Sequence, residues 1–129
     1  VMRRVRRRVA LLTEMFRDAG LPVAPHHDPA DAMSLAVTFD TEDAAIAFAE
    51  NRGVRRLFDN SKHVYTAWEP LLQRRMAHPA LDPWNYTGVN TPMGDCPRTL
   101  DLLRRSCVVN PLPDLALPLV RLVGKRLIG

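Results

Sequence analysis

The first twenty residues constrain the fold most, because their pattern predicts one amphipathic helix. Val5, Val9, Leu12 and Phe16 recur at helical spacing on one face, and Gly20 supplies a stop signal. Five arginines fall within the first eight residues, where cations oppose the helix dipole by roughly a few tenths of a kcal/mol each. No Ser, Thr, Asp or Asn precedes the helix to cap it. We therefore expect that this helix starts before residue 1 and that the chain is the C-terminal piece of a longer protein.

Composition indicates a globular domain. The 129 residues, 47% of them hydrophobic, are enough to bury a substantial core. No apolar run is long enough to span a bilayer and no export signal is visible, so we expect a cytoplasmic protein without a membrane partner. Cys96 and Cys107 are the only cysteines, and we expect both to be free thiols in that compartment.

The net charge of +4 is weak support for a nucleic-acid partner. The positive excess lies mainly in the first helix, and the rest of the chain is nearly balanced. Only Lys62 and Lys125 are lysines, while arginine, alanine and proline are abundant, which indicates a bias of the coding DNA. A solvated or subunit-facing helix side is therefore favoured over a nucleic-acid interface.

The remaining pattern predicts an α+β fold in a single domain spanning 1–129. Strands are expected at 34–40, 54–58 and 106–110, an extended segment at 63–68, and further helices beginning near 41, 70, 97 and 114. This order predicts a small, mostly antiparallel sheet of three to four strands, covered on one side by helices.

Local signals place the ends and faces of these elements. Asp40 or Thr41 should cap the second helix, and Asp114 the last one, with Pro118 in the first turn or two. Cys107 should point inward from its strand. The inward side of the second helix is expected to consist of Ala45, Ile46, Phe48 and Ala49.

The stretch 79–95 is predicted to be a long loop. It holds Trp84 and Tyr86 among several prolines and glycines. Loops of this length are usually functional or interfacial, so the two aromatic side chains are candidates for contact with substrate or a neighbouring subunit.

Four stretches together resemble a known family. They are LAVTFDTED at 35–43, HVYTAWEPLL at 63–72, RRMAHP at 74–79 followed by DP at 82–83, and DCPRTLDLLR at 95–104. Their order and spacing are similar to the C-terminal small domain of DegT/DnrJ-type sugar aminotransferases, which are pyridoxal-phosphate (PLP) enzymes of the aspartate-aminotransferase fold. The part from 63 to 83 looks closest to the branch that makes an 8-amino-octulosonate, a sugar acid of the outer envelope (lipopolysaccharide).

The resemblance implies an activity that belongs to a longer protein. It implies amino transfer, from glutamate, to a keto or aldehyde sugar in a homodimer, with PLP held by a large domain that this sequence lacks. Lys62 and Lys125 do not match the family's cofactor lysine, and the scattered glycines form no phosphate cradle. We therefore expect this chain alone to bind no PLP, to contain no catalytic residue and to catalyse nothing.

The segment holding His63, Tyr65 and Trp68 is the candidate substrate site. Residues 63 and 65 would point the same way on an extended segment. Histidine can transfer protons near neutral pH, tyrosine can bond sugar hydroxyls and tryptophan can stack on a sugar ring. The resemblance implies that this region faces the substrate. The alternative is that Tyr65 and Trp68 are core aromatics and His63 a surface group.

Other reactive side chains are weaker candidates. Adjacent His26, His27 and Asp28 favour a polar turn over a metal site, and Cys96, Cys107 and His78 lack metal-ligand spacing. Glu69 is expected to cap the helix that begins at Pro70.

A rival function class is non-enzymatic. In it, the chain is a stand-alone binding module whose basic first helix docks an acidic partner or nucleic acid.

Overall fold

A three-stranded antiparallel sheet organises this chain, of which the computed structural model describes every residue except 61, 63, 74 and 82–95. The strands lie in the order β1 (Leu35–Thr38), β3 (Ser106–Val109) and β2 (Val54–Arg56). The α+β class and the antiparallel sheet are confirmed. The second strand is shorter than predicted, because the backbone turns after Leu57, whose carbonyl accepts the N–H of Asn60.

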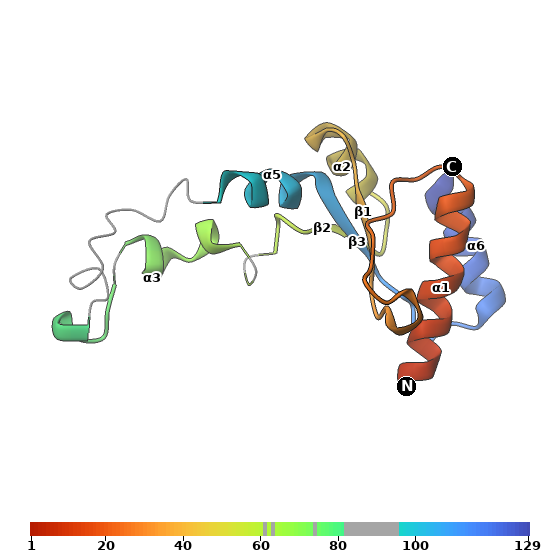
Figure 1. Cartoon of the computed structure of the whole chain (residues 1–129), viewed down its shortest axis with the longest axis horizontal. Helices are drawn as coiled ribbons and strands as arrows, with labels where there is room; N and C mark the ends of the chain where they lie inside the picture. Colours follow the sequence, from red (N-terminus) through yellow and green to blue (C-terminus); the bar gives the residue numbers. More distant parts are fainter. Residues whose placement is uncertain (61, 63, 74, 82–95) are drawn as a thin grey trace.

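The helices lie around this sheet and beyond it (Figure 1). They are α1 (Met2–Asp18), α2 (Glu42–Ala49), α3 (Glu69–Leu72), α5 (Pro97–Arg105) and α6 (Leu117–Ile128), with 3-10 turns η1 (Pro29–Asp31), η2 (Tyr65–Ala67) and η3 (Pro79–Leu81). α1 and α6 lie side by side at one end of the molecule, whereas α3 lies near the other end.

One face of the sheet carries the apolar core. The register pairs Leu35 with Val109 and Val37 with Cys107, and all four side chains are buried. The helix α1 covers this face with the stripe that the sequence predicts, since Val5, Val9, Leu12 and Phe16 are all buried.

The helix α2 completes the core beside α1. Thr41 rather than Asp40 caps it, accepting a hydrogen bond from the N–H of Ala44 at 3.2 Å. Ala45 and Phe48 are buried, and the Phe48 ring meets Phe16 edge-on at 6.2 Å. The predicted inward position of Ile46 is wrong: the buried pair defines the inner side, and Ile46 lies about 100° around the helix from Ala45 and is exposed.

The last helix starts later than predicted. α6 begins at Leu117 with Ala116 as its N-cap, so Asp114 is not the cap. Pro118 explains the difference, because proline lacks the N–H that a later helical position must donate and is tolerated in the first turn.

Close packing of α6 on α1 depends on a glycine. A methyl group at Gly124 would lie 2.8 Å from Met15 Cε and 3.1 Å from Leu12 Cδ2. The Met15 side chain could move aside, but Leu12 is fully buried. Gly124 therefore sets the distance between the two helices.

A large side chain at Gly124 should loosen this packing. We expect Gly124→Leu to lower the free energy of unfolding by about 2 kcal/mol, as for other overpacked cores, in urea denaturation followed by circular dichroism. Lys125→Leu, at the exposed neighbouring position, is the control and should change stability little. Equal stability of the two variants would contradict the packing role of Gly124.

Candidate functional site

A 3-10 turn, η2, spans Tyr65–Ala67 with Trp68 as its C-cap, so the prediction of an extended segment is wrong over 65–67. The N–H of Ala67 donates to the carbonyl of Val64 at 3.0 Å, and that of Trp68 to Tyr65 at 2.9 Å. These bonds are local, whereas an extended segment would need a neighbouring strand to satisfy its backbone.

The two aromatic residues stand at the two ends of this turn. Tyr65 is the first residue of the 3-10 helix and Trp68 follows its last residue, so one turn separates them along the chain. Trp68 is 44% exposed, which excludes the alternative that it is a core aromatic, and Tyr65 is half-buried. His63, the third predicted member of the site, lies outside the described residues, as do Trp84 and Tyr86.

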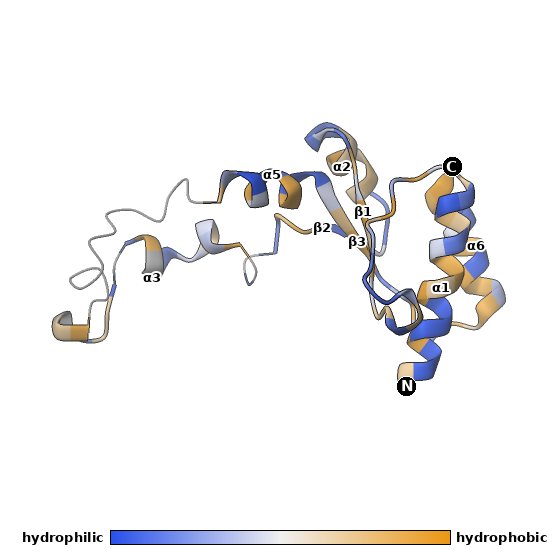
Figure 2. Cartoon of the chain, viewed as in Figure 1, coloured by the Kyte–Doolittle hydropathy of each residue, from blue (hydrophilic) through white to orange (hydrophobic). Residues whose placement is uncertain are grey.

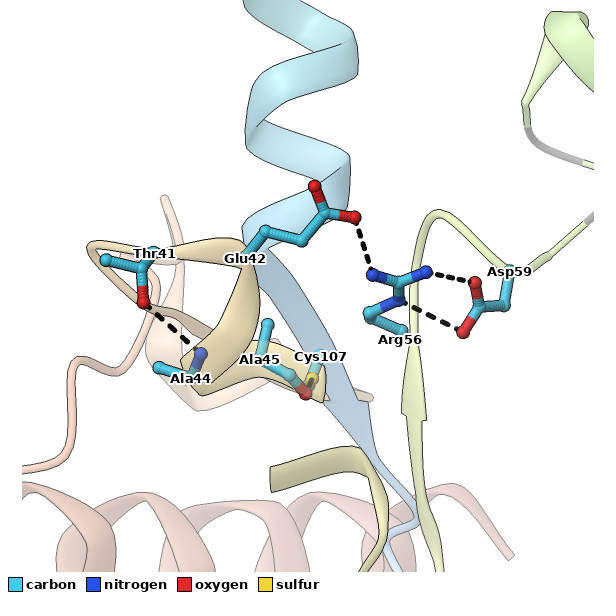
Figure 3. Close-up of polar contacts among 7 residues, drawn as sticks. All are labelled: Thr41, Glu42, Ala44, Ala45, Arg56, Asp59 and Cys107. Atoms are coloured by element: carbon cyan, nitrogen blue, oxygen red, sulfur yellow. Dashed lines mark hydrogen bonds and ion pairs between the residues drawn. The ribbon is translucent and has the colours of Figure 1, made fainter. Parts of the chain in front are cut away.

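A charged cluster at the end of β2 fixes the start of the segment that carries these aromatics (Figure 3). Arg56 donates from Nη2 and Nε to both carboxylate oxygens of Asp59, at 2.7 and 3.1 Å, and from Nη1 to Oε1 of Glu42 at 2.7 Å. The Arg56 side chain is only 13% exposed. Through these hydrogen bonds, Arg56 connects β2 to helix α2 and to the turn that follows β2.

The charged groups of this cluster bond one another: Arg56 bonds both Asp59 and Glu42. The hydrogen bonds from Arg56 hold the pKa of the Asp59 carboxyl below its usual 3.8 and raise the pKa of Arg56 itself. The guanidinium of Arg104 lies 4.8 Å from the ring centre of Phe58 and that of Arg56 lies 5.8 Å from it, within the range of cation–π attraction. We assign these residues a positioning role, because both acids are engaged by the arginine.

Sequence reasoning missed this cluster. Glu42 and Arg56 are separated by 14 positions, and nothing in their spacing indicates contact. The one available signal was the alternation of Arg56 with Val54 on the same strand. Because the two residues are two positions apart, the Arg56 side chain lies on the same face of the sheet as Val54, the face that the helices cover.

Cys107 is a structural thiol, as its strand position predicts. It is fully buried, and its Sγ donates to the carbonyl of Ala45 at 3.2 Å (Figure 3). Burial raises its pKa from 9.0 to about 11. Cys96 is exposed, so the two cysteines have opposite environments and are not brought together.

The described histidines His26, His27 and His78 lie in local turns. The ring of His26 stacks on that of His27 with centres 4.7 Å apart, and its Nδ1 accepts the N–H of Asp28. His78 accepts the N–H of Ala80 in the same manner. Within the described residues, no group of three or more potential ligands could hold a metal ion.

Glu69 does not cap a helix, because α3 already includes it. Its carboxylate lies 3.9 Å from Arg75.

Two arginines of the basic first helix, Arg8 and Arg6, form contacts within the fold. Arg8 is buried, with its guanidinium donating to the carbonyls of Leu115 and Arg4. Arg6 forms an ion pair with Asp31 at 3.1 Å. This leaves fewer arginines for the docking role of the rival interpretation than the sequence suggests.

A groove of about 340 Å³ runs between α1 and the segment 23–36. Its lining is rich in alanine and proline, and its polar members are Thr13, Glu14, Arg17, Asp18, His26 and Ser34. Within the described residues, no hydrogen bond or ion pair joins two of these polar side chains.

Comparison with known proteins identifies no relative of this chain. No protein-family model, curated protein or solved structure matches this chain. None of the described helices has the combination of length and apolar character needed to cross a bilayer. The resemblance to DegT/DnrJ enzymes therefore rests on the four sequence stretches.

Thiol chemistry should distinguish the two cysteines. We expect one thiol per chain to react quickly with Ellman's reagent under native conditions, because Cys96 is exposed and Cys107 is buried with a raised pKa. Cys96→Ser should abolish the fast reaction, and denaturant should release the second thiol. Fast reaction of the Cys96→Ser variant would contradict the buried position of Cys107.

The Arg56–Asp59 bond should make stability depend on pH. Because the pKa of Asp59 is lowered by folding, its contribution is present above the unfolded value and is lost as pH falls through the folded pKa. We expect the melting temperature of Asp59→Asn to be below that of the parent near about pH 6, and this difference to shrink below pH 3.8.

The exposed acid Glu14, on α1, offers the matched control. Glu14→Gln should leave the melting temperature close to that of the parent near neutral pH. A constant difference between parent and Asp59→Asn at every pH would contradict the assigned bond.

Proposed function

We propose that this chain is the substrate-closing small domain of a PLP-dependent sugar aminotransferase. In the intact enzyme an amino group passes from glutamate to a keto or aldehyde carbon of a sugar, with an octulosonate as one candidate acceptor. The enzyme would be a cytoplasmic homodimer, with PLP held by its large domain. The four sequence stretches support the family, and the α+β fold is compatible with it.

One structural observation carries the proposal for substrate contact. The described residues between β2 and α5 lead away from the sheet, and Tyr65 and Trp68 lie at the two ends of one 3-10 turn outside the apolar core. An exposed tryptophan beside a tyrosine suits a sugar, since an indole stacks on the ring and a phenol bonds its hydroxyls. Arg56 would fix the direction in which this segment leaves the sheet.

The lysines of this chain do not fit PLP. Lys62 is exposed and its backbone N–H donates to Asn60. Lys125 is exposed in the last turn of α6. Neither lies in the groove along α1, so no chemical step is assigned to a lysine of this chain. The amine and the phosphate site would come from the large domain.

A chimera tests the proposal. This chain would replace the small domain of a DegT/DnrJ-type enzyme, and transfer from glutamate to keto sugars would be measured. We expect turnover, and we expect Trp68→Ala to lower kcat/KM by about tenfold, the equivalent of one lost stacking contact. The PLP absorption spectrum should not change in that variant.

Leu102→Ser provides the control, because Leu102 is exposed on α5 and is assigned no role. It should leave kcat/KM unchanged. A chimera that folds, dimerises and binds PLP but transfers no amino group would contradict the proposed function. A Trp68→Ala chimera as active as its parent would refute the substrate role of Trp68.

A further inference from the structure

We propose that the outer face of α6 is a docking surface for an acidic amphipathic helix of a protein partner. This outer face consists of Leu119, Leu122, Arg121, Lys125 and Arg126, all of them exposed. The proposal is independent of the aminotransferase assignment, because it concerns a different element and uses neither Tyr65 nor Trp68.

The helix α6 has apolar residues on two opposite sides. Its inner side buries Val120, Gly124 and Leu127 against α1. Leu122 lies about 140–160° around the helix from these three residues and is 65% exposed, and Leu119, on the flank between the two sides, is 49% exposed. Most of the length of α6 is hydrophobic, whereas the first half of α1 is largely hydrophilic (Figure 2). A helix that is apolar on both sides is typical of one packed between two layers, and α1 supplies only one of them.

The charges on this face select the partner's chemistry. Every charged residue of α6 is basic, namely Arg121, Lys125 and Arg126, and none of them forms an ion pair within the described part of the chain. Two copies meeting through this face would bring together three cations from each, which repel. A partner with carboxylates around an apolar stripe would instead complement both the charge and the leucines.

The distribution of charge also favours one orientation. The first turn of α6 is uncharged, and Arg121, Lys125 and Arg126 follow it. Acidic residues are most stable near a helix N-terminus. A partner helix that runs antiparallel to α6 places its acidic first turns beside Lys125 and Arg126, and its apolar stripe beside Leu119 and Leu122.

A synthetic helical peptide tests the proposal on the full chain. Its leucines recur at i, i+3 and i+7, and glutamates flank them in its first two turns. We expect saturable binding in fluorescence anisotropy, weakened by salt as ion pairs are screened. Leu122→Ser should reduce the affinity by about tenfold, because an exposed leucine would no longer be buried. Lys125→Glu should reduce it similarly.

Two controls distinguish specific binding at this surface from non-specific binding. Leu102→Ser removes a leucine of α5 that is 50% exposed and should leave the affinity unchanged. A peptide with lysine in place of each glutamate should not bind.

Three kinds of outcome would overturn the proposal. The first is equal binding of the acidic and basic peptides, or an affinity that Leu122→Ser does not change. The second is self-association of the parent chain in sedimentation that Leu122→Ser abolishes, which would make a second copy the occupant. The third is binding to vesicles of phosphatidylcholine and phosphatidylglycerol that displaces the peptide, which would assign the face to an anionic lipid surface.

Discussion

The buried stripe of α1 is the constraint on which the rest of the structure depends. Leu12 and Phe16 are fully enclosed, with the sheet and α2 on one side and α6 on another. Gly124 allows α6 to approach closely, and the buried guanidinium of Arg8 holds the carbonyl of Leu115 just before α6 begins. Removing α1 would therefore expose both the sheet face and the inner side of α6.

Sequence patterns identified the elements whose partners are close in sequence or whose periodicity is strong. The stripe of α1 and the strands at β1 and β3 follow from spacing and residue type, which also narrow the cap of α2 to Asp40 or Thr41. The predictions failed where geometry depends on a competing local preference. Pro118 moved the start of α6 past Asp114, and local backbone bonds made a 3-10 turn at Tyr65.

The candidate site also has one part that the sequence predicts and one part that it does not. The aromatic character of Tyr65 and Trp68 was visible in the sequence, whereas the cluster that anchors their segment was not. The fork of Arg56 depends on Glu42 being brought beside β2 by the packing of α2. Such a contact is a product of tertiary structure, so spacing along the chain carries no trace of it. The exposed leucines of α6 were similarly hidden within a helix that sequence alone presents as strongly apolar.

The strand order has a consequence for how this chain reaches its native state. The central strand β3 is the last to be synthesised, and its Ser106 bonds a threonine of β1 that lies 68 positions earlier. The outer edge of β1 is bonded to residues 22–24, which precede it in the chain, whereas its inner edge and β2 have no native strand partner until β3 has been made. Closing so long a loop is entropically unfavourable and slow. The nascent chain therefore carries unpaired strand edges until β3 emerges, a period in which a chaperone would be of most use to it.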